Sequence, residues 1–184
     1  MTDSSEPDYQ SLLRKFRRKP LFPLEQDDLF VRVDYSGEDI KKLIPHRDPF
    51  LLVDRITGLD VTNRRIIGEK HLSPALPVFQ GHFPGYPVYP GTLEVEMLGQ
   101  LGLCLFPFIL SGTTDIPEFS DQTAIRATRI IGAYYVEPVL PDTTVTILSQ
   151  GYEYDGYFGR SIGQVISGGK VCCVAAGEVI FLES

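Results

Sequence analysis

The sequence predicts an α+β domain in which a curved antiparallel sheet wraps one long buried helix. Residues 92–110 form a helical pattern that is apolar on all sides, as expected of a buried helix. Gly168-Gly169 is a two-residue hairpin signal between the last two strand patterns. Two strand patterns precede the helix, and four follow it, at 123–136, 143–155, 158–167 and 170–182. A helix without a polar face needs apolar surface all around, which a curled sheet and a second subunit provide.

The chain of 184 residues is predicted to contain an N-terminal extension, 1–34, and one domain, 35–184. The extension is polar and charged, and Pro20 and Pro23 interrupt any long helix in it. One short amphipathic helical turn is expected there, from Leu12, Leu13 and Phe16.

Within the domain, residues 38–44 are predicted to form a short helix that Pro45 ends. Strands are expected at 50–59 and at 65–72. A loop rich in proline and glycine, 73–91, then leads into the long helix.

Charge and cysteine content exclude several classes of function. The net charge of −7 argues against nucleic acid as a partner. No apolar signal-peptide core is seen near the N-terminus, and Glu94 and Glu96 interrupt the most apolar window, so a buried helix is favoured over a membrane span. The cysteines show no metal-site or disulfide spacing: Cys104, Cys172 and Cys173. We therefore expect a cytoplasmic protein without a metal.

The extension carries a local basic cluster that departs from the acidic average. The cluster could attract an acidic partner or a membrane surface, although a solvated face or a mobile arm is the simpler interpretation. It consists of Arg14, Lys15, Arg17, Arg18 and Lys19.

The loop before the long helix carries the chemistry. His82 lies in this loop, and Glu96 follows fourteen positions later in the first turns of the helix. Pro90-Gly91 opens the helix, so free backbone N–H groups there can stabilise an oxyanion. An imidazole, a carboxyl group whose pKa is raised by burial, and an oxyanion site suit proton abstraction next to a thioester carbonyl with loss of a β-hydroxyl.

Composition and spacing leave the choice of acid open. Glu94 and Glu96 point about 200° apart on a helical wheel, so only one can face a given site. A glutamate in a first helical turn more often complements the helix dipole. A single histidine in a loop is more often structural than catalytic, and we expect His46 to organise its own loop.

A resemblance to a known family resolves this choice. The segment from Gly81 to Gln100, GHFPGYPVYPGTLEVEMLGQ, resembles the signature GHFPGRPVMPG and following helix of the beta-hydroxyacyl-acyl-carrier-protein dehydratases of the FabZ type. Residues 44–55, IPHRDPFLLVDR, resemble that family's PHRYPFLLVDR segment. Residues 136–142 more weakly resemble its RPVVPGD turn. The resemblance extends from about Asp39 to Leu182.

The resemblance implies a hot-dog fold, a homodimer that is possibly assembled into a hexamer, and no cofactor. His82 matches the catalytic histidine and Glu96 the catalytic acid, and the family takes these two from opposite subunits. The backbone N–H of Gly91 matches the group that polarises the thioester carbonyl, and Phe83 matches a position near the acyl tunnel. The implied reaction converts 3-hydroxyacyl thioesters, carried by acyl carrier protein or by CoA, to trans-2-enoyl thioesters in fatty acid or related lipid biosynthesis.

Two residues depart from the family pattern and keep other functions in view. Tyr86 stands where the family has Arg near the carrier-protein entrance, and Tyr89 stands where it has Met. The basic cluster could compensate for the missing Arg. The alternatives are a hot-dog acyl thioesterase and a non-catalytic acyl-binding accessory protein, and the presence of both His82 and Glu96 argues against each.

Overall fold

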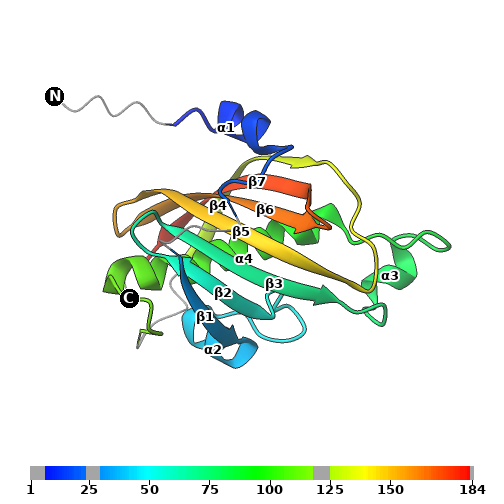
Figure 1. Ribbon diagram of the computed structural model, residues 1–184, viewed down its shortest axis with the longest axis horizontal. Helices are drawn as coiled ribbons and strands as arrows, with labels where there is room; N and C mark the ends of the chain where they lie inside the picture. Colours follow the sequence, from blue (N-terminus) through cyan, green and yellow to red (C-terminus); the bar gives the residue numbers. More distant parts are fainter. Residues whose placement is uncertain (1–6, 24–29, 118–124, 183–184) are drawn as a thin grey trace.

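A computed structural model describes residues 7–23, 30–117 and 125–182 of the chain. In this part the strands form one antiparallel sheet in the order β1-β2-β3-β5-β6-β7-β4. The sheet curves around the long helix α4, Gly91–Ser111 (Figure 1). The strands are β1 Val31–Ser36, β2 Arg55–Asp60, β3 Arg65–Leu72, β4 Ile125–Tyr135, β5 Thr143–Tyr154, β6 Phe158–Ser167 and β7 Lys170–Phe181. This architecture is the hot-dog fold that the sequence predicts.

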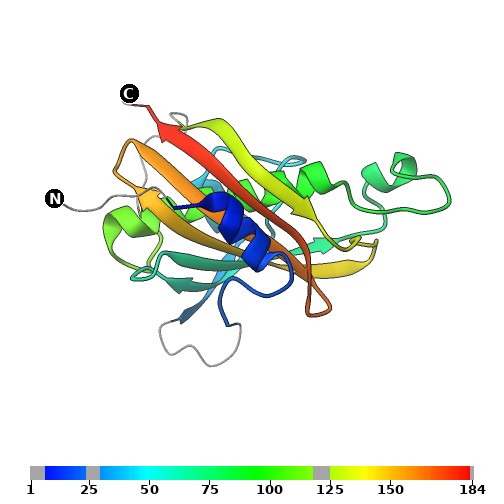
Figure 2. The same cartoon turned by 90° about the horizontal axis from the view of Figure 1, so that it is seen from above.

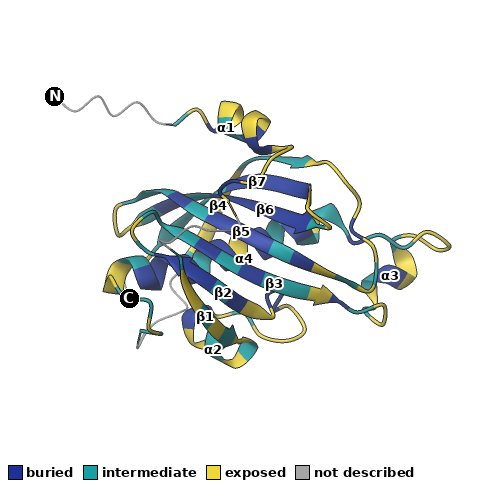
Figure 3. Cartoon of the chain, in the orientation of Figure 1, coloured by how far each residue is buried: buried dark blue, intermediate teal, exposed yellow. Residues whose placement is uncertain are grey.

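Helix α4 forms the centre of the main hydrophobic core. Its buried side chains contact β3, β5, β6 and β7, and the central strands are largely buried while loops and the short helices carry many of the exposed residues (Figure 3). The helix is long and apolar enough to cross a membrane, but 67% of its most apolar window is buried, as in the core helix of a folded domain. It ends where Gly112 adopts a φ of 68°, a left-handed conformation that closes helices and favours glycine.

The predicted strand at 50–59 is wrong over its first half. Only β2 forms a strand, and Phe50 and Leu52 are hydrogen-bonded to Gln100 of α4 instead. The backbone N–H of Leu52 donates to the side chain of Gln100, so it has no strand partner. Leu51, Leu52 and Val53 are therefore core residues outside any strand, while Phe50 is exposed.

Two short elements were not expected from the pattern. Strand β1, VRVDYS, alternates apolar and polar residues, a period-two strand signal that the prediction of an extension over 1–34 did not use. Helix α3, Val78–Gly81, lies in the predicted loop, and helix α2, Gly37–Leu43, closely matches the predicted short helix. The hairpin at Gly168-Gly169 joins β6 to β7 as predicted.

The N-terminal segment packs on the outer face of the sheet. Helix α1, Tyr9–Phe16, crosses strands β4 and β7 on the side opposite α4 (Figure 2). Leu13 is fully buried there, in a second hydrophobic cluster with residues of β5, β6 and β7. The side chain of Gln164 accepts a hydrogen bond from Leu21 N–H at 2.8 Å and donates to the carbonyl oxygens of Phe16 and Lys19. The division into 1–34 and 35–184 remains a prediction, and β1 begins at Val31.

Candidate active site

His82 is held by three hydrogen bonds in the loop before α4. It ends helix α3, where its N–H donates to Val78 O at 3.0 Å. The ring atom Nδ1 lies 3.0 Å from Val88 O, and Val88 N–H donates back to His82 O at 2.8 Å. A carbonyl oxygen only accepts, so Nδ1 carries the hydrogen and Nε2 is left with its lone pair. The imidazole is thereby oriented as a base.

Aromatic packing fixes the two ends of this loop. The Phe83 ring stacks on His82 with the ring centroids 4.1 Å apart. At the other end the buried Tyr89 ring packs on Phe79. The backbone N–H of Tyr89 donates to Val139 O at 2.8 Å. The loop is therefore tied to the segment that follows β4.

A pocket of about 340 Å³ opens between this loop, the start of α4 and the end of β4. We call it the His82 pocket, and its lining includes His82, Gly91, Thr92, Glu94, Tyr135 and Glu137. A Cβ atom at Gly91 would lie 2.5 Å from Cδ1 of Tyr135, so only glycine fits under that ring. Gly91 N–H is among the first N–H groups of α4, which intrahelical bonding leaves free.

Glu96 lies in a second hollow, between α4 and the inner face of the sheet. This hollow, here called the α4 groove, is lined mainly by apolar side chains and glycines, including Gly102, Gly163 and Gly177. Thr92 lines both hollows, so the groove adjoins the His82 pocket at the start of the helix. Within one chain, however, His82 and Glu96 do not line the same hollow.

The environment of Glu96 lowers the pKa of its carboxyl group. His46 Nε2 lies 3.4 Å from Glu96 Oε1, and Gln100 Nε2 donates to the same oxygen at 2.9 Å. These contacts outweigh the effect of burial and favour the ionised form, His46 more than Gln100. The expectation that burial raises the pKa of this group is wrong for the single chain, because the side chain is still 36% exposed and has polar partners.

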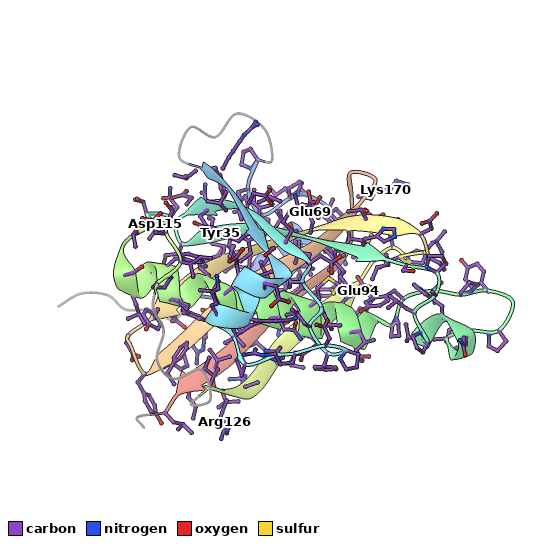
Figure 4. All side chains as sticks on the ribbon, turned by 90° about the horizontal axis from the view of Figure 1, so that it is seen from below. Tyr35, Glu69, Glu94, Asp115, Arg126 and Lys170 are labelled. Carbon is purple, nitrogen blue, oxygen red and sulfur yellow. The ribbon has the colours of Figure 1, made fainter. Side chains whose placement is uncertain are left out.

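Glu94 has the opposite environment. Its side chain points to the His82 pocket side of the helix, and the residue is only 4% exposed. Burial raises the pKa of its carboxyl group to about 8. Figure 4 shows Glu94 on the N-terminal half of α4, the half nearest the His82 loop. The two glutamates that the pattern left as rivals therefore face different hollows, and each has its own ionisation state.

The sequence of this chain matches a known protein family and several known relatives. Residues 44–157 match the family model described as a FabA-like domain. The chain is 34% identical over 145 residues to the 3-hydroxyacyl-[acyl-carrier-protein] dehydratase FabZ of Chlamydia trachomatis serovar L2, covering 79% of this chain and 90% of that protein. It is 37% identical over 142 residues to the protein of the same name from Pelotomaculum thermopropionicum, covering 77% and 94% of the two chains.

Among solved structures, the fold is similar to a chain of the dehydratase heterocomplex ApeI:P from Xenorhabdus doucetiae. The TM-score is 0.57 at 15% identity, over 79% of this chain and 91% of that one. At this identity the likeness concerns the fold alone.

Proposed function

Because the chain belongs to the FabA-like family, we propose that it dehydrates 3-hydroxyacyl thioesters to trans-2-enoyl thioesters. The observation that carries the proposal is the hydrogen bond between His82 Nδ1 and Val88 O. It leaves Nε2 of His82 as a base in a pocket that also contains the free N–H groups at the start of α4. A base beside an oxyanion site is what removal of a proton from C2 of a thioester requires.

The proposed reaction needs one base, one acid and one oxyanion site. His82 Nε2 takes the C2 proton, and the electrons of the broken C–H bond move onto the thioester oxygen, which Gly91 N–H stabilises. The carbonyl then re-forms, the C2=C3 double bond forms, and the C3–O bond breaks. Glu96 delivers a proton to the departing hydroxyl, which leaves as water. Transfer of the C2 proton from His82 back to Glu96 resets the site.

We place His82 and Glu96 of one site on two subunits of a homodimer. The two side chains line different hollows in one chain, which is what a shared site requires. Strand β4 is the last strand of the sheet, and Ile130 on it is 66% exposed, so this edge is open to a second copy. Further assembly into a hexamer is part of the same proposal.

Dimer formation also raises the pKa of the Glu96 carboxyl group, which its role as an acid requires. A partner subunit and a bound acyl chain would remove water from a side chain that is 36% exposed in one chain. Loss of water disfavours the ionised form and raises the pKa of a carboxyl group. We infer that Glu96 becomes an acid only in the assembled, occupied site.

The thioester is proposed to arrive on acyl carrier protein, with CoA as the alternative carrier. The mouth of the His82 pocket is not basic, because Glu137 lines it and the neighbouring loop carries the exposed Tyr86. The basic cluster on and after α1 is exposed and is the candidate surface for an acidic carrier. We place the enzyme in the cytoplasm, in keeping with its three free cysteines.

One assay tests this function against the alternatives. A 3-hydroxyacyl thioester is offered to the purified protein, and the conjugated enoyl product and free thiol are followed separately. Enoyl product that depends on His82 supports the dehydratase. Thiol release without enoyl product supports a thioesterase, and neither product supports an acyl-binding accessory protein.

A further inference from the structure

Glu94 has a carboxyl oxygen with no hydrogen-bond partner in the part of the chain that the structure describes. Its Oε2 is buried, and the residue as a whole is 4% exposed. A buried carboxyl group without a partner costs free energy, and the simplest packing of this position would be an apolar side chain. Glu94 occupies this position instead, and it lines the His82 pocket together with Gly91.

The groups that face Glu94 do not favour its ionised form. The negative charge of an ionised Glu94 would raise the pKa of the neighbouring groups. These are Tyr89 from the loop, Tyr135 from β4, and Cys172 and Cys173 from β7. His82 and Glu137 line the same pocket.

Burial raises the pKa of Glu94 to about 8. The carboxyl group is therefore protonated at neutral pH, and a protonated carboxyl carries an O–H donor that a carboxylate lacks.

We propose that Glu94 is a further catalytic residue, which donates a hydrogen bond to the thioester oxygen of the substrate together with the N–H of Gly91. The inference rests on the proposed dehydratase function. Glu94 and Gly91 are three positions apart on α4, so they share a side of the helix, and both line the His82 pocket. Two donors then converge on the oxygen that becomes negative when His82 removes the C2 proton.

The protonation state of Glu94 decides the sign of its effect. A neutral acid stabilises the developing negative charge and keeps its own proton, as a buried, protonated aspartic acid does in the oxyanion hole of ketosteroid isomerase. An ionised Glu94 would repel the same charge and would offset the positive end of the helix dipole that otherwise stabilises the oxyanion. The rate should therefore fall as the pH rises through about 8.

Two variants test the donor role. Glu94→Leu removes the donor and fills the space with an apolar side chain, so the fold should be retained and the melting temperature should not fall. We expect its kcat to fall by about 10²–10³, the usual loss for one oxyanion donor, with KM changed little. Glu94→Gln keeps an N–H donor and cannot ionise, so it should keep kcat within about tenfold of wild type and lose the decline above pH 8.

Two results would overturn the inference. One is a folded Glu94→Leu variant with a kcat within about threefold of wild type, which a donor of this kind does not allow. The other is an alkaline decline that persists unchanged in Glu94→Gln. Failure of the dehydratase function itself would look different, because wild-type protein would then form no enoyl product at any pH.

A spectroscopic measurement completes the test without turnover. A carbon-13-labelled enoyl thioester is bound to His82→Ala protein, and the infrared stretching frequency of its carbonyl is recorded. Hydrogen bonds to the oxygen lower this frequency, so adding Glu94→Leu should move it back toward its value in water-free solvent. An identical frequency with and without Glu94 would contradict the proposed contact.

Discussion

Gln100 donates a hydrogen bond to Glu96 from the next turn of α4, with Nε2 2.9 Å from Oε1. The same amide nitrogen donates to Phe50 O at 2.9 Å, and the amide oxygen accepts from Leu52 N–H at 2.8 Å. Gln100 is fully buried, so one side chain both orients the proposed acid and ties residues 50–52 to the helix.

Gln100→Leu should therefore lower both stability and activity. Loss of the amide leaves the buried Leu52 N–H unpaired, at a cost of about 1–3 kcal/mol, and leaves Glu96 without its orienting donor. Chemical denaturation and kcat on a 3-hydroxyacyl thioester measure the two effects. Gln164→Leu is the matched control, because Gln164 is also fully buried and makes three hydrogen bonds to backbone groups, but on the outer side of the sheet. The control should lose stability and keep its kcat; equal losses of kcat in both variants would contradict the role of Gln100.

The stability of the protein should depend on pH through Glu94. The carboxyl group keeps its proton up to about pH 8 in the folded chain, whereas its ordinary pKa is 4.5. Between these values the unfolded chain loses the proton first, so stability falls as pH rises, by up to about 1.4 kcal/mol per pH unit, and levels off above pH 8. Denaturation of wild type and Glu94→Gln from pH 5 to 9 measures the difference. The difference in unfolding free energy between the two proteins should increase in favour of the variant up to about pH 8. A difference that does not change with pH would contradict the buried, neutral state of Glu94.

Gly91→Ala should disrupt the start of α4. The added methyl group would lie 2.5 Å from the Tyr135 ring, so the ring or the loop must move, and both enoyl formation and stability should fall. Gly99→Ala is the control on the same helix, since nothing lies within 4 Å of its added Cβ and alanine favours helix by about 1 kcal/mol. Adding Tyr135→Ala to Gly91→Ala should restore part of the stability. If Gly91→Ala alone behaves like wild type, the tight contact is not a constraint on the site.

Charge reversal of the basic cluster tests how the carrier docks. Arg17 and Arg18 are exposed, and the Arg17 guanidinium lies 5.9 Å from the centre of the Tyr134 ring on β4. Arg17→Glu with Arg18→Glu should raise KM for a substrate on acyl carrier protein and leave KM for the CoA or pantetheine thioester unchanged. Initial rates on both substrates measure this. An unchanged KM on the carrier substrate would exclude this surface as the docking site.

The long helix and the sheet could be predicted because their signals are long and regular. Residues 92–110 are apolar on every side, and the strands after them run for ten or more residues with turn residues between them. The irregular run at 50–54 could not be predicted, since hydrogen bonds between the backbone of Phe50 and Leu52 and the side chain of Gln100 decide it. Strand β1 does carry an alternating pattern, which the prediction of an extension over 1–34 did not use.

The site was predictable only in part. The loop motif identified His82 and the helix start, but no pattern in the sequence indicates that Glu94 faces the His82 pocket while Glu96 faces the α4 groove. Helix geometry separates the two side chains, but which of them faces the His82 pocket depends on how α4 is rotated against the loop and the sheet. Tyr135, the last residue of β4, and Glu137, just after that strand, line the pocket from far along the chain, and their sequence positions carry no signal of it.

We propose that His82 of one subunit acts with Glu96 of its partner. His82→Ala and Glu96→Ala should each lose about 10²–10⁴ in kcat, as removal of a general base or acid does. The decisive measurement is the rate of enoyl formation by a mixed dimer, made by co-expressing the two variants with different affinity tags and purifying on both. One of its two sites then contains an intact pair, so it should regain roughly half of the wild-type rate. A mixed dimer as inactive as either variant alone would contradict the shared site.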